Sequence, residues 1–272
     1  MHALLLLALA FAPSPDAGAP PDPLAAPRAL FAHRLDRASL DAAIAELKAM
    51  HWHEALLLNA RAHRFRAEAF ELRRRPLDEV AGLADLEAAR ALGLQAWQLC
   101  APGAPRQVQD QKLASALAQT GADCVPALIE LAEDDLAISA WRRPIDAVPL
   151  LREALALAGK AEQFDPAFAA GAPRRIRAEA LAILPPTAGG SLRAARFEFE
   201  RAIAAAPEWV ANRVQMAARY AVEAQDRALF HALLQSALAI NVRAIPDRMP
   251  EQLLARTRAL ALLHRERELF RG

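Results

Sequence analysis

The side chains best suited to binding a metal lie near residue 50. His51, His53 and Glu54 are close together in the sequence, and His63 follows them. A zinc site needs imidazole and carboxylate groups that converge on one point. Because residues two positions apart lie on different sides of a helix, His51 and His53 are poorly placed to bind one ion. We therefore expect no metal site, and we expect exposed histidines near the start of a helix.

A second group with chemical potential is the acidic run Glu133, Asp134 and Asp135, which follows an apolar stretch. A general acid or base needs a carboxylate in a pocket that shifts its pKa. Three consecutive carboxylates cannot all face one pocket, so catalysis is disfavoured. We expect a solvated helix face, and the alternative is the polar mouth of a binding cleft.

Arginines cluster at the predicted helix ends, where they could bind an acidic partner or a ligand carboxylate. These residues are Arg142, Arg143, Arg174, Arg175 and Arg177. We expect them instead to cap and solvate helix ends. The sequence contains no GxGxxG, GxxxxGK[ST], GxSxG, HExxH or CxxC motif. These observations predict a protein that is not an enzyme and that carries no cofactor.

Composition points to an all-α fold as the framework for these groups. Hydrophobic residues make up 54% of the chain and aromatic residues only 6%, so the apolar content is mostly alanine and leucine. The 33 basic and 32 acidic residues leave a formal net charge of +1, which disfavours binding to nucleic acid. Helical periodicity predicts helices over 40–49, 52–74, 77–99, 107–119, 125–141, 145–163, 167–183, 191–206, 208–222, 225–241 and 250–270.

The clearest repeat signal begins at Ser191, directly after a pair of glycines, and ends at Pro207. Ala195, Phe199 and Ala202 are spaced at i, i+4 and i+7, so they share one helix face, and Pro207 ends the helix. This spacing is typical of the second helix of a tetratricopeptide hairpin. A weaker copy runs from residue 154 to residue 166, with alanine in place of the aromatic residue. We expect stacked helical hairpins that form a tetratricopeptide-like superhelix.

The N-terminal residues differ in composition from the rest of the chain. An apolar run from residue 3 to residue 12 precedes a proline-rich stretch, which predicts a secretory signal peptide and a linker over residues 1–27. The alternative is a misassigned start or an apolar tail. Residues 12–25 contain no cysteine, so we expect no lipoprotein anchor, and we expect residues 28–272 to form one helical domain. The two cysteines, Cys100 and Cys124, are either a disulfide pair or two buried thiols.

Four segments resemble the T-component family of the tripartite ATP-independent periplasmic (TRAP) transporters. They are ARALGLQAWQLC at 89–100, VPALIELAEDDLAISA at 125–140, ILPPTAGGSLRAARFEFERAIA at 183–204 and QDRALFHALLQSALA at 225–239. The resemblance implies a periplasmic protein of cryptic tetratricopeptide hairpins, and because no apolar segment after residue 30 is long enough for a membrane helix, we expect it to be soluble. It also implies oligomerisation, a solute-binding protein as partner, and a cleft that holds an apolar ligand. A scaffold for an envelope complex, without a small-molecule ligand, is the alternative function.

Large side chains on the predicted helices 167–183 and 208–222, and at the end of 125–141, are the candidates for lining this cleft. They are Trp141, Phe168, Ile176, Trp209, Asn212 and Tyr220. Their mixture of apolar groups with a few polar ones suits an apolar or amphipathic small molecule. Of the four tryptophans, we expect each to pack in the core, with Trp141 and Trp209 nearest the cleft; the other two are Trp52 and Trp97.

Overall fold

The computed structural model describes residues 22–72, 78–104 and 110–270, and these residues form helices and no strands. The α-helices are α1 (Ala25–Ala32), α2 (Arg37–Leu47), α3 (His53–Arg66), α4 (Glu79–Cys100), α5 (Asp110–Ala118), α6 (Val125–Ser139), α7 (Pro144–Phe164), α8 (Phe168–Ile183), α9 (Leu192–Ala205), α10 (Val210–Gln215), α11 (Arg227–Leu238), α12 (Met249–His264) and α13 (Glu266–Leu269). Short π-helical segments continue α3 over Ala67–Glu71 and α10 over Met216–Ala221. The prediction of an all-α fold is confirmed.

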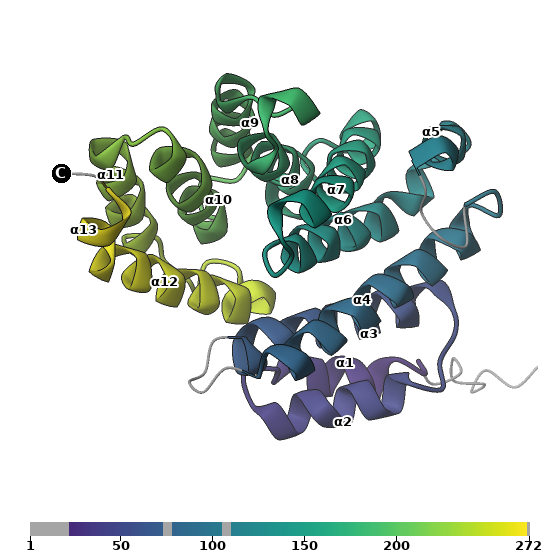
Figure 1. Cartoon of the computed structure of the whole chain (residues 1–272). Helices are drawn as coiled ribbons and strands as arrows, with labels where there is room; N and C mark the ends of the chain where they lie inside the picture. Colours follow the sequence, from purple (N-terminus) through teal and green to yellow (C-terminus); the bar gives the residue numbers. More distant parts are fainter. Residues whose placement is uncertain (1–21, 73–77, 105–109, 271–272) are drawn as a thin grey trace, which may run out of the picture.

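Most helices pack against their neighbours in the sequence, as in proteins built from stacked hairpins. The strongest contacts join α3 to α4, α6 to α7, α7 to α8, and α8 to α9. Helices α1–α4 lie together at the bottom of the view in Figure 1, and α10–α13 lie together at the left, where α12 comes close to the N-terminal helices. The superhelical path of a tetratricopeptide array stays a prediction. None of the helices in the described ranges is long and apolar enough to cross a membrane.

The predicted repeat helix is α9, and its core residues are buried as expected. Ala195, Phe199 and Ala202 are completely buried, which confirms their prediction as core positions. The helix begins after Ser191, whose hydroxyl accepts a hydrogen bond from the backbone N–H of Ala194 at 3.2 Å. Local periodicity therefore predicted both the helix and the face that packs.

Helix α8 begins with a tight turn that the periodicity did not reveal. Ala169, Ala170 and Gly171 have φ angles of 46°, 60° and 76°, so three consecutive residues are left-handed. A Cβ atom at Gly171 would lie at an ordinary contact distance of 3.4 Å from the backbone of Ala202, so it is the left-handed φ angle rather than lack of space that favours glycine here. The right-handed part of α8 follows this turn, and Pro173 lies in its first turn, where a missing N–H is tolerated.

Helix α1 lies partly within the segment predicted as linker. It begins at Ala25, and both Leu24 and Pro27 are buried. Pro27 is the third residue of the helix, so its missing N–H costs little. The predicted signal peptide lies outside the described residues. Arg34, which follows α1, connects the N-terminal helices to α12 through an ion pair with Glu251 at 2.6 Å.

The tryptophans differ in burial. Trp97 is completely buried, and its indole N–H donates a hydrogen bond to the hydroxyl of Thr120 at 3.0 Å. Trp209 is buried, and Trp141 is partly buried against the cluster that contains Leu86 and Ile138. The prediction of core packing is wrong for Trp52, which is 41% exposed. Trp52 immediately precedes α3, so it lies outside the helical surface that packs against neighbouring helices.

Candidate functional site

The acidic run in α6 is buried, so the prediction of a solvated helix face is wrong. Asp134 and Asp135 are completely buried, and the side chain of Glu133 is 25% exposed. Helix α6 contacts α3, α4, α7 and α8, so neighbouring helices cover it on several sides. Glu130 and Asp134 are four residues apart and face α3, whereas Asp135 lies further around the helix and faces α4.

Arg64 of α3 is the centre of the ion network on the first of these faces. Its guanidinium group pairs with Glu130, with Glu133 at 2.7 Å and with Asp134 at 2.7 Å. Arg61, one turn earlier on α3, forms a second ion pair with Glu130. Two arginines of α3 therefore bind three carboxylates of α6.

The second face of α6 is joined to α4 and α7 through a shared arginine. Arg90 of α4 donates a hydrogen bond to Asp135 at 2.6 Å and to Glu153 of α7 at 2.7 Å. Both carboxyl groups are buried, and one arginine is shared between them. This arrangement joins α4, α6 and α7 through charged side chains rather than through apolar contacts alone.

Arg175 extends the network to the C-terminal helices. It is buried and pairs with Glu133 at 2.7 Å, and it donates to the side-chain oxygen of Asn212 at 3.2 Å. The amide of Asn212 donates to the backbone oxygens of Ala202 at 2.9 Å and Ala170 at 3.2 Å. Asn212 therefore ties the left-handed turn of α8 to α9 and to the network.

The prediction that the arginines solvate helix ends holds for only two of them. Arg142 and Arg143 lie on the surface, the latter with 80% of its side chain exposed. The prediction is wrong for Arg174, Arg175 and Arg177, whose side chains are at most 30% exposed and pair with carboxylates of other helices. These three residues lie on the part of α8 that packs between α7 and α9, where neighbouring carboxylates bind them.

Burial raises the pKa values of the carboxyl groups of the network, whereas the neighbouring arginines lower them. Burial raises the pKa of Asp134 to about 8 although Arg64 opposes this shift. Burial and the charge of Glu153 raise the pKa of Asp135 well above its usual range against the effect of Arg90. Burial also acts to raise the pKa of Glu130, but Arg61 and Arg64 outweigh it and lower that pKa to about 2. The network therefore contains both ionised and protonated carboxyl groups at neutral pH.

Two of these carboxyl groups are incompletely hydrogen-bonded. The second oxygens of Asp134 and Asp135 are buried and have no hydrogen-bond partner among the described residues. A buried carboxylate with one free oxygen is poorly solvated, which favours the protonated form. The network can therefore store protons and hold helices in fixed positions. None of the residues of the network lines either of the two surface pockets described below.

The six residues predicted to line a cleft belong to different packed regions. Phe168 and Ile176 pack in the core shared by α3–α8, and Tyr220 packs in the core of α8–α12. Trp141 packs with Leu86 and Ile138, Trp209 is buried before α10, and Asn212 binds the α8 turn as described. None of the six lines either of the two surface pockets described below. The predicted cleft stays a prediction.

The histidines make no metal site within the described residues, which contain no group of three potential ligands arranged for a metal. His53 is the first residue of α3, and His63 bonds to a carboxylate oxygen of Asp85 at 2.8 Å. Asp85 also pairs with Arg66 at 2.6 Å, so this histidine belongs to an ion cluster between α3 and α4.

Cys100 and Cys124 form a disulfide in the structure, with Cα atoms 5.6 Å apart. Cys100 is the last residue of α4, and Cys124 immediately precedes α6. The bridge therefore connects the ends of the two helices that carry Arg90 and Asp135. It closes the segment that contains α5.

Sequence reasoning identified the acidic residues but missed the residues that bind them. Arg61, Arg64, Arg90 and Glu153 are far from the acidic run in the sequence, so no local pattern connects them with it. Glu130 could have been found, because it is a charged residue within the apolar run that begins at Val125. A charged residue in an otherwise buried helix indicates a paired interior charge.

Comparison with known families identifies one match. The family described as TRAP transporter T-component matches residues 48–270, from the end of α2 to the end of the described chain. A search of curated protein sequences finds no match to this chain.

Proposed function

The chain belongs to the TRAP transporter T-component family, and we propose on this premise that it is a non-enzymatic partner subunit of a TRAP-type solute-binding protein. The observation that carries this proposal is the extent of the match, which includes residues from α3 to α13. The family is a component of a transporter, so a role in TRAP transport follows directly. Beyond this role, we propose that the solute-binding protein is the direct partner of the chain.

The ion network of α6 supports a scaffold rather than an enzyme. Burying charges costs desolvation free energy, and the pairing of Arg64 with its three carboxyl partners, of which Asp134 is protonated at neutral pH, offsets this cost only when the helices keep their positions. Such a network favours one arrangement of α3, α6 and α8. A subunit that presents a fixed surface to a partner benefits from this rigidity.

We propose that the protein works in the periplasm. The apolar run and proline-rich stretch in residues 1–27, most of which lie outside the described residues, have the order expected of a signal peptide and linker. The disulfide between Cys100 and Cys124 supports an oxidising compartment. Mass spectrometry of the protein from a periplasmic fraction should find the mature N-terminus between residues 13 and 25. Recovery of the full-length chain from the cytoplasm would contradict export.

We also propose that the protein binds a small molecule. Trp209, which precedes α10, and Gln215, at its end, each carry a buried polar atom with no hydrogen-bond partner among the described residues. A ligand with a polar group near α10 would satisfy such atoms. This observation favours an amphipathic small molecule over a purely apolar one.

The experiment is co-purification of the tagged protein from periplasmic extract, followed by identification of bound proteins and small molecules by mass spectrometry. The proposal predicts recovery of a TRAP solute-binding protein, and direct binding should be reproduced with the two purified proteins. Size-exclusion chromatography with light scattering measures whether the chain forms a homo-oligomer. If the purified solute-binding protein does not bind, the envelope-complex scaffold replaces the proposed function.

A further inference from the structure

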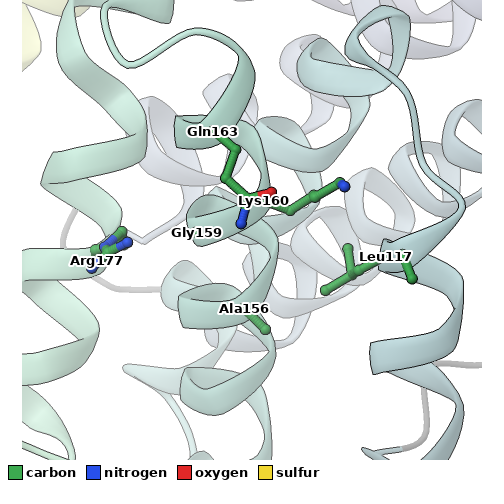
Figure 2. Close-up of a pocket in the computed structure, with 7 residues that line it drawn as sticks. Leu117, Ala156, Gly159, Lys160, Gln163 and Arg177 are labelled. Atoms are coloured by element: carbon green, nitrogen blue, oxygen red, sulfur yellow. The ribbon is translucent and has the colours of Figure 1, made fainter.

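Two adjoining surface pockets form one groove along the C-terminal half of α7. Their volumes are about 390 and 320 Å³, and they share Gly159, Gln163 and Arg177 as lining residues. The first pocket lies between α5 and α7, and the second continues toward α8 and α9. Figure 2 shows the first pocket, with Leu117 of α5 facing α7 and Arg177 of α8 on the other side. We call this combined surface the α7 groove.

The α7 groove has an excess of positive charge. Its lining includes the cations of Lys160, Arg174, Arg177 and Arg201. Only one lining residue is acidic, Glu162, and it is shared by three arginines, with Arg177 at 2.9 Å, Arg174 at 3.2 Å and Arg201 at 3.5 Å. One carboxylate cannot satisfy all the donors of three guanidinium groups.

A second acidic residue reduces this excess without removing it. Glu198 of α9 lies beside the groove and pairs with Arg177 at 3.2 Å and with Arg201 at 3.7 Å. The Nε atom of Arg177 is buried and has no hydrogen-bond partner among the described residues. Four cations and two carboxylates therefore meet at this surface, and the remaining charge is complementary to an acidic group.

Exposed aromatic rings lie beside the cations of the groove. The Lys160 amino group is 4.8 Å from the ring centroid of Phe164, and the guanidinium carbon of Arg201 is 5.4 Å from that of Phe197. The two phenylalanines are 41% and 58% exposed. Arginine and aromatic side chains, including phenylalanine, are enriched at protein interfaces. Their position beside the groove indicates an interaction surface.

We propose that the α7 groove binds an acidic segment of a partner protein. A small molecule normally buries most of its surface in its site, whereas both pockets here open widely to solvent and extend across four helices. A peptide segment matches that extent, and its carboxylates match the arginines. The base of the groove is unobstructed, because a Cβ atom at Gly159 would approach only the end of Arg177, at 3.7 Å. This inference holds whether or not the partner is a solute-binding protein.

The test changes the charge at Gln163, an exposed residue that lines both pockets. The probe is a fluorescent synthetic peptide of about 12 alternating glutamate and leucine residues, and binding to the whole mature protein is measured by fluorescence anisotropy at low salt. Gln163→Glu should weaken binding about threefold and Gln163→Lys should strengthen it about threefold, as expected for one partly screened charge. The matched control is Gln235→Glu, which makes the same charge change at an exposed residue of α11 and should leave binding unchanged.

Several results would overturn the inference. The first is that the glutamate peptide does not bind. The second is that a peptide with lysine in place of glutamate binds equally well. The third is that the Gln163 variants bind the glutamate peptide with the same affinity as the Gln235→Glu control. Binding of phosphatidylglycerol vesicles that depends on Gln163, without peptide binding, would assign the groove to a membrane surface instead. The proposed function is tested separately with the purified solute-binding protein. If that protein binds without any effect of Gln163, the proposed function stands and the solute-binding protein contacts another surface, and the peptide measurement alone decides the α7 groove inference.

Discussion

Replacement of Asp134 by asparagine should change how the stability of the protein depends on pH. The groups that face Asp134 are Arg64 of α3 and the carboxylates Glu130 and Glu133 of α6 itself. Burial raises the pKa of Asp134 from 3.8 to about 8, so the folded protein keeps this proton at neutral pH. In the unfolded chain the same carboxyl group is exposed and loses its proton near its ordinary pKa.

The size of the effect follows from the difference in bound protons. Between the two pKa values the folded state holds about one proton more than the unfolded state, so a rise in pH lowers the free energy of unfolding. One proton corresponds to about 1.4 kcal/mol for each pH unit. The introduced asparagine would not titrate, and its amide oxygen can still accept a hydrogen bond from Arg64. The stability of Asp134→Asn relative to wild type should therefore increase by about 3 kcal/mol between about pH 5 and about pH 7.

Urea denaturation followed by circular dichroism at several pH values measures this difference. Asp135 and Glu179 also have raised pKa values, but they titrate in both proteins and largely cancel in the comparison. The matched control is Asp146→Asn, because Asp146 has a side chain that is 45% exposed and pairs with Arg143 on the surface. Its difference from wild type should stay within about 0.5 kcal/mol over this range. A constant difference for Asp134→Asn would refute the proposed protonation of Asp134.

Three further substitutions test the packing, the disulfide and the α8 turn. Phe199→Ala should lower the free energy of unfolding by about 3–5 kcal/mol in urea denaturation, because Phe199 is completely buried, and a loss below about 1 kcal/mol would contradict its role in the core. Joint replacement of Cys100 and Cys124 by alanine should cost about 3 kcal/mol, since the bridged residues are 24 positions apart, and a reducing agent should then have no further effect. Asn212→Ala should cost about 2–4 kcal/mol, because two backbone carbonyls and a buried arginine lose their partner. Asn241→Ala, at an exposed position, is its control, and equal stability of these two variants would show that the turn does not need Asn212.

Features that depend on local spacing were predictable from the sequence. The positions of Ala195, Phe199 and Ala202 determine one helix face whatever the rest of the chain does, and all three are buried. The same periodicity located most of the other helices. It missed α1, because prolines near residue 25 suggested a linker although proline is tolerated in the first turn of a helix.

Features that depend on which helices surround a residue were decided only by the tertiary structure. Nothing near Asp134 in the sequence indicates that α3 supplies Arg64 or that α6 has neighbours on several sides, so its burial was missed. The six cleft candidates lie on or beside the predicted helices, but packing distributes them among separate cores. The α7 groove likewise combines residues from four helices: Arg174 and Arg177 are neighbours on α8, but no local pattern brings Arg201 of α9 to them. Periodicity reports the direction of a side chain from its own helix axis, whereas its environment depends on contacts between residues far apart in the chain.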